Sequence, residues 1–279
     1  MPEQPQPSGP ANSSELIQRA LARVIRDPEL AAAIERDPQG TLATLGLDDA
    51  TRTGMLALGP QRLVAYHHMV HSRIFRTTQS FLGGAAQWMG PDRLHEEIHT
   101  WVRSTGPDTC IFRDVPADFV TWSLPRWAQD PDTPDWLGPL AELEVGKRMV
   151  RNDPRPNGVQ SEAPIDLDRG IATNPTTLIL RFDWAIHPVP SPLPTDFDPE
   201  PGHFAVACFR QLDDRVYTQP LKPRSAALLT RLIAGQTLRE ALFGACEDVG
   251  ETLDDDILGQ TALSLAKYID LHLLLGGAA

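Results

Sequence analysis

Two histidines lie one helical turn apart in the segment His95-Glu96-Glu97-Ile98-His99. On a helix, two such imidazoles can share a zinc ion while Glu96 acts as general base on a zinc-bound water. The extended zinc-protease motif needs a third histidine shortly afterwards, and residues 100–106 contain none. We therefore expect a solvated or partly packed helix face here, and a zinc metallohydrolase that uses this helix is the alternative.

A second group of histidines lies in residues 61–84, which also contain three arginines and no acidic residue. Because the formal charge of the whole chain is -12, a basic helix stands out in this composition. The pattern favours a docking face for an acidic partner or peptide. Pairing of the same charges with acidic neighbours across a helix bundle is the other interpretation. The expected docking residues are Arg62, Tyr66, His67, His71, Arg73 and Arg76.

Other catalytic patterns are not visible in the sequence, which shows no nucleophile elbow, phosphate loop, dinucleotide-binding glycine pattern or triad order. Cys208 lies in an apolar strand pattern, which is typical of a buried small hydrophobic residue. We therefore expect no catalytic residue, no metal ligand and no cofactor in this chain.

The acidic composition argues against a broad nucleic-acid surface, since phosphate binding needs clustered Lys and Arg. From residue 222 onward there are five basic and eight acidic side chains, which opposes the remaining alternative, a winged-helix DNA-binding regulator. No stretch approaches the ~20 apolar residues of a membrane helix, so we expect no membrane partner. Three distant cysteines without a CxxC motif are typical of a reducing cytoplasm.

Hydrophobic periodicity and Pro/Gly punctuation divide the chain into four parts. We expect a disordered tail over residues 1–13, a helical domain over 14–152, a linker over 153–175 and a second domain over 176–279. In the helical domain the clearest predicted helices are Gln61–Phe81, Pro91–Ser104, Pro116–Ala128 and Pro134–Arg151.

The second domain begins with β-rich runs at Thr176–Ile186, Phe204–Phe209 and Val216–Gln219. Three predicted helices follow, over Pro223–Ala234, Thr237–Glu247 and Asp254–Leu275. The fold class is therefore α+β, with an all-helical domain followed by a small winged-helix-like domain.

An exposed edge of a winged-helix sheet can accept an extended peptide as an added strand. The last two predicted strands are the candidates for that edge, and a small structural hairpin is the other interpretation. The expected peptide-binding residues are Phe204, Val206, Cys208, Arg210, Val216 and Tyr217.

Three stretches of the chain resemble one protein family when they are taken in order. The shared positions are diffuse hydrophobic, Gly and Pro positions spread over about residues 60–275. A Leu stands at position 82, where the family usually has Pro. The stretches are Tyr66 to Gly84, Phe112–Phe119 with Trp136–Glu144, and Leu228 to Leu242.

The chain resembles the methanobactin-biosynthesis partner-subunit family, helper proteins of multinuclear non-haem iron oxidases. The resemblance implies a non-catalytic partner protein that forms a heterodimer with such an oxidase. The partner binds the leader of a ribosomally made precursor peptide and presents it for modification at a cysteine. It also implies a second domain similar to RiPP recognition elements, which hold leader peptides, and iron in the oxidase.

Overall fold

The computed structural model describes residues 13–109 and 111–278 and divides into two compact units. The helical unit comprises the described residues up to Ser80 together with Gly90–Phe119. The α/β unit comprises Phe81–Met89 and the described residues from Val120 onward. The tail expected over residues 1–13 lies, apart from its last residue, outside the described part.

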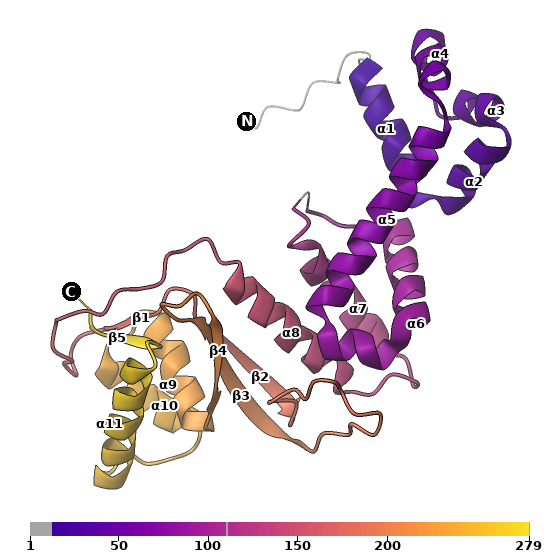
Figure 1. Ribbon diagram of the computed structural model, residues 1–279. Helices are drawn as coiled ribbons and strands as arrows, with labels where there is room; N and C mark the ends of the chain where they lie inside the picture. Colours follow the sequence, from indigo (N-terminus) through magenta and orange to yellow (C-terminus); the bar gives the residue numbers. More distant parts are fainter. Residues whose placement is uncertain (1–12, 110, 279) are drawn as a thin grey trace, which may run out of the picture. The chain divides into compact units, whose positions relative to one another are not determined.

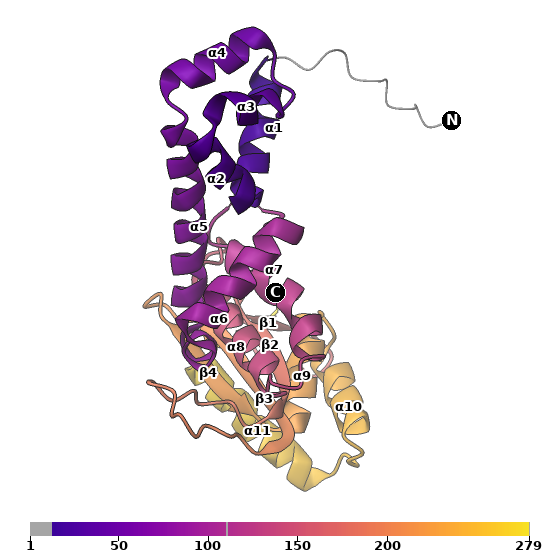
Figure 2. The ribbon, with the colours of Figure 1, turned by 90° about the vertical axis from the view of Figure 1, so that its right-hand side faces the viewer.

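Four short helices begin the helical unit and gather around the start of a long one (Figures 1 and 2). Aspartates set the boundaries between them: Asp27 accepts the Glu29 and Leu30 amides, and Asp48 accepts the Thr51 amide. Apolar side chains from all four, together with Val64, form one core cluster. The helices are α1 (Ser13–Arg26), α2 (Pro28–Arg36), α3 (Pro38–Ala43) and α4 (Asp49–Leu58).

The long helix α5 (Gln61–Phe81) has the bounds that its periodicity predicts. Helix α6 (Gly83–Ser104) is kinked at Gly90, whose φ of 73° lies in the left-handed region that favours glycine. Pro91 follows directly, so the helix predicted over Pro91–Ser104 is the part of α6 beyond the kink. Helix α7 (Val115–Trp127) comes next in the chain.

A three-stranded antiparallel sheet in the order β2-β3-β4 is the centre of the α/β unit. Its strands are β2 (Leu178–Trp184), β3 (Pro201–Arg210) and β4 (Val216–Leu221). Helix α8 (Leu137–Arg151) covers one face: a side chain at Gly146 would meet Leu178 and Leu180 of β2. Helices α9 (Pro223–Ile233), α10 (Leu238–Asp248) and α11 (Asp255–Asp270) lie on the other side (Figure 1).

Side chains along each strand point alternately to the two faces of this sheet, so the strand position of a residue gives the face on which it lies. The Arg181 guanidinium, on the helix-bundle face, donates to the Ala226 carbonyl and the Thr230 hydroxyl of α9. Phe209 of β3 and Leu229 of α9 belong to the buried cluster on that side. An α+β protein with an N-terminal helical region and a small C-terminal α/β region is therefore confirmed.

The structure differs from the sequence prediction in the last helix, in two short strands and in the unit boundary. The last helix ends at Asp270 instead of Leu275, because His272 adopts a φ of 57° and the chain then forms β5 (Leu274–Gly277). Strand β5 pairs with β1 (Ile171–Thr173), which lies inside the predicted linker. The unit boundary also falls before that linker, since α8 packs on the sheet.

Candidate functional site

Strand β3 is the central strand of the sheet and is paired on both sides. The expectation that Phe204–Arg210 forms an exposed edge is therefore corrected: neither its amides nor its carbonyls can take a further strand. Val206 and Cys208 are buried on the face that α8 covers, and burial raises the pKa of the Cys208 thiol to about 11. Phe204, near the start of β3, is 39% exposed.

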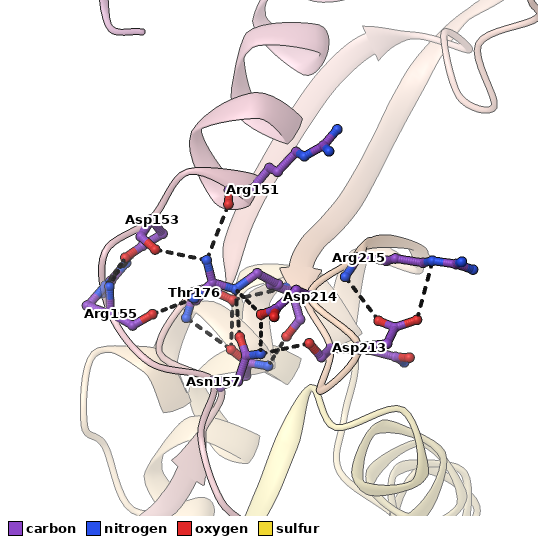
Figure 3. Close-up of polar contacts among 11 residues, drawn as sticks. Arg151, Asp153, Arg155, Asn157, Thr176, Asp213, Asp214 and Arg215 are labelled. Atoms are coloured by element: carbon purple, nitrogen blue, oxygen red, sulfur yellow. Dashed lines mark hydrogen bonds and ion pairs between the residues drawn. The ribbon is translucent and has the colours of Figure 1, made fainter. Parts of the chain in front are cut away.

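Arg210, at the end of β3, is used within the fold (Figure 3). Its guanidinium donates to Asn157 Oδ1 at 2.7 Å and to the carbonyls of Arg151, Asp153 and Arg155. These bonds hold the loop after α8 against the β3–β4 hairpin. Because the side chain is 12% exposed and its donors are taken, Arg210 acts as a clamp for this loop.

Strand β4 is an edge strand, since within the described residues it pairs only with β3. The Gln211 amide donates to the Arg215 carbonyl at 3.0 Å and so sets the alternation of the hairpin. In an antiparallel ladder, residues alternate between pairs whose main-chain groups bond the partner strand and pairs whose groups point away. Counting from Gln211 and Arg215, the main-chain N–H and C=O groups of Val216 and Thr218 point away from β3. Pro220 is the next residue of β4 whose main-chain groups point away from β3, so its missing N–H removes no hydrogen bond to β3.

Side chains on β4 are only partly covered. Tyr217 is 37% exposed and stacks on Phe209, with 6.5 Å between the ring centroids. The Thr218 hydroxyl lies 2.8 Å from His187 Nε2, and burial lowers the pKa of His187. Val216 and Tyr217 are thus the two members of the predicted peptide-binding set that lie on an open edge.

A cavity of about 590 Å³ adjoins the end of β4. Its wall continues from the strand onto α9 and α11 and is both apolar and basic. Arg224 pairs with Glu251 and donates to Gln260, whereas Lys222 and Lys267 have no ion pair within the described residues. The lining includes Gln219, Pro220, Lys222, Leu263, Lys267 and Tyr268.

In the helical unit, four histidines from α5 and α6 form a row. Ring centroids are 4.3 Å apart for His67 and His71, 4.6 Å for His71 and His99, and 4.7 Å for His95 and His99. His67 Nδ1 lies 2.9 Å from the Val24 carbonyl, and His71 Nε2 lies 2.7 Å from the Ile25 carbonyl. Both side chains are buried, so neither can belong to an exposed docking face.

This row also places the HEEIH segment. His95 and His99 turn toward α5 and line a cavity of about 290 Å³, whose lining does not include the exposed Glu96. Burial lowers the pKa of His71 to about 4 and also lowers that of His99. Over residues 13–109 and 111–278, no three His, Cys, Asp or Glu side chains are arranged to hold a metal ion.

The outer face of α5 carries the rest of the predicted docking set. Arg62, Tyr66, Arg73 and Arg76 are all exposed. The structure adds Met69, which is 57% exposed between Tyr66 and Arg73. Its position could have been found from the sequence, because residues 62, 66, 69, 73 and 76 share one helix face at alternating spacings of four and three.

The three-stranded sheet and the three helices that follow it form a small α/β region. Residues 174–269 match the family model of the HvfC C-terminal domain. HvfC is linked to a RiPP-type oxidase partner system, in which ribosomally made peptides are modified. No curated protein matches the chain. In the described residues, no helix combines the length and apolar character that a membrane crossing requires.

Proposed function

We propose that this chain is a non-catalytic partner protein of a multinuclear non-haem iron oxidase. It binds the leader of a ribosomally synthesised precursor peptide and presents the peptide for modification at a cysteine. The match of residues 174–269 to the HvfC C-terminal domain supports a partner role of this class. The iron belongs to the oxidase, and this chain contributes position, which makes the encounter effectively intramolecular.

The open edge of β4 is the observation that carries this proposal. A peptide that adds as a strand needs main-chain N–H and C=O groups that point away from the sheet. Val216 and Thr218, two residues apart on β4, supply such groups. Pro220 supplies no N–H, so the peptide pairs with the hairpin end of β4 and leaves the strand near the cavity. Main-chain bonds give affinity in this mode, and side-chain pockets give specificity.

The cavity beside β4 sets the chemistry of the side chains that follow. Lys222 and Lys267 form no ion pair within the described residues, and Leu263 is 75% exposed. A leader with an acidic and an apolar side chain next to its paired segment fits this wall, because the acid pairs with the lysines and the apolar side chain covers the leucine. DNA fits the same unit poorly, since its helices carry more acids than bases.

The test replaces one outward amide of β4. Thr218→Pro removes the N–H that faces the peptide and leaves the ladder with β3 intact. Thr218→Val is the matched control, because it keeps the amide and removes the same hydroxyl bond to His187. The ligands are leader peptides synthesised from short reading frames beside the gene, titrated by calorimetry into the full chain.

We expect Thr218→Pro to weaken leader binding by about two- to tenfold, which corresponds to the roughly 0.5–1.5 kcal/mol of one lost hydrogen bond. Thr218→Val should bind like the wild type, and both variants should keep the wild-type far-UV spectrum. Equal binding by the proline variant would place the peptide elsewhere, and no binding of any leader by the wild type would refute the peptide-binding function.

A further inference from the structure

The exposed stripe of α5, defined as Arg62, Tyr66, Met69, Arg73 and Arg76, has no partner among residues 13–109 and 111–278 that accounts for its composition. The opposite side of the helix buries Val64, His67, His71, Ile74 and Thr78, so the stripe is the face that the fold leaves open. At 1.5 Å per residue the stripe is about 21 Å long, so it can contact a partner at several side chains.

Charge distinguishes this stripe from an ordinary solvated face. Helix α5 has no acidic residue, and its three arginines form no ion pair within the described residues, although the chain as a whole is strongly acidic. Arg73 instead lies over the ring of Phe112, with 5.7 Å between Cζ and the centroid. Among the described residues, no acidic neighbour neutralises these arginines.

Apolar surface accompanies the charge. Tyr66 and Met69 are 42% and 57% exposed, and Ile111 and Phe112 beside the stripe are 46% and 43% exposed. A hollow of about 360 Å³ adjoins Met69, its apolar wall, and is otherwise lined by Ser72, Arg73, Arg76, Thr77 and Ser80. Arg, Tyr and Met around a hollow are the composition of a protein–protein contact centre.

We infer that the α5 stripe docks an acidic segment of the partner protein, with carboxylates opposite the arginines and one apolar side chain in the hollow near Met69. This inference rests on the proposed function, in which that partner is the iron oxidase. A net charge of -12 on this chain repels nucleic acid and a second copy at long range, whereas a local acidic segment meets the arginines directly.

Association should therefore be sensitive to ionic strength, because exposed charge pairs are screened within about 8–10 Å at physiological salt. Leader binding through main-chain bonds on β4 should respond much less. The two interactions can thus be separated by salt in the same protein.

The experiment measures the affinity of the purified full chain for a multinuclear non-haem iron oxidase of the same source by calorimetry. The two salt concentrations are about 50 and about 300 mM NaCl, roughly one third and twice the physiological ionic strength. The double variant Arg73→Glu/Arg76→Glu reverses the charge of the stripe. The control Arg36→Glu reverses an exposed arginine on α2 that also forms no ion pair within the described residues. Met69→Ala tests the apolar contact, and leader binding is measured for every variant.

We expect the double variant to lose at least about tenfold in oxidase affinity at low salt, Met69→Ala about threefold or more, and Arg36→Glu nothing. Leader affinity should stay unchanged in all three, which shows that they fold. If the double variant binds the oxidase with wild-type affinity, the inference about the α5 stripe is wrong and the partner function stands. If the wild type forms no complex with the oxidase, both fall. A wild-type dimer that the double variant abolishes would identify a second copy as the occupant and overturn the inference.

Discussion

At the residue scale, burial decides which side chains of a predicted set can act. The i, i+4 spacing of His67 and His71 is visible in the sequence, but the carbonyls of Val24 and Ile25 that they contact come from a helix more than forty residues earlier. Nothing local to α5 shows that contact. Arg62 and Tyr66, which face away from it, could be predicted correctly as exposed from helix periodicity.

The neutral state of His71 makes stability depend on pH. Its pKa is lowered to about 4 in the folded protein by burial, with the nearby His67, His95 and His99 adding repulsion, whereas the unfolded chain has the ordinary value of 6.5. The unfolded state thus binds a proton first, so the free energy of unfolding should fall as pH drops from 6.5 toward 4. The loss for this group should approach about 3 kcal/mol.

Urea unfolding of the wild type, His71→Gln and His203→Gln between pH 7 and pH 5 measures this effect. The His71 variant should lose part of the wild-type slope. The His203 variant controls for the removal of a surface imidazole, one that is 93% exposed and lies 3.0 Å from Asp183. An unchanged slope in His71→Gln would show that His71 is protonated equally well in the folded protein.

At the element scale, local signals predicted helices well and strand order badly. Helix α5 ends where Leu82 and Gly83 follow Phe81, and α10 begins at a capping box between Thr237 and Glu240. Both boundaries are set by residues close together in the sequence. The middle position of β3 depends on pairing with β2 across a proline-rich loop. Strands β1 and β5 are three and four residues long and pair across about a hundred residues, which no periodicity reveals.

The space around two helical glycines, one packed and one open, predicts the outcome of substituting each. A Cβ at Gly146 would lie 2.9 Å from Leu180 Cδ1, so Gly146→Leu should destabilise the protein by about 1–3 kcal/mol through overpacking. Gly259 on α11 has open space around it, so Gly259→Ala should stabilise by about 0.5–1 kcal/mol. Thermal unfolding compares the two, and a tolerated Gly146→Leu would contradict the packing of α8 on β2.

At the scale of the whole molecule, the two proposed interactions lie on different units. The α/β unit offers the β4 edge with its basic cavity, and the helical unit offers the α5 stripe. Composition alone could predict an acidic protein with a helical and a mixed region. It could not show that the basic residues gather on these surfaces, because that depends on which helix faces are buried. The family match covers residues 174–269 and so bears on the α/β unit.

Reconstitution tests the central claim most directly. Iron-loaded oxidase is mixed with the full-length precursor peptide, with and without this chain, and modified peptide is counted by mass spectrometry over time. We expect this chain, stripped of metal beforehand, to raise the rate on the order of a hundredfold or more by holding the peptide beside the oxidase. Equal rates with and without the chain would contradict the partner function.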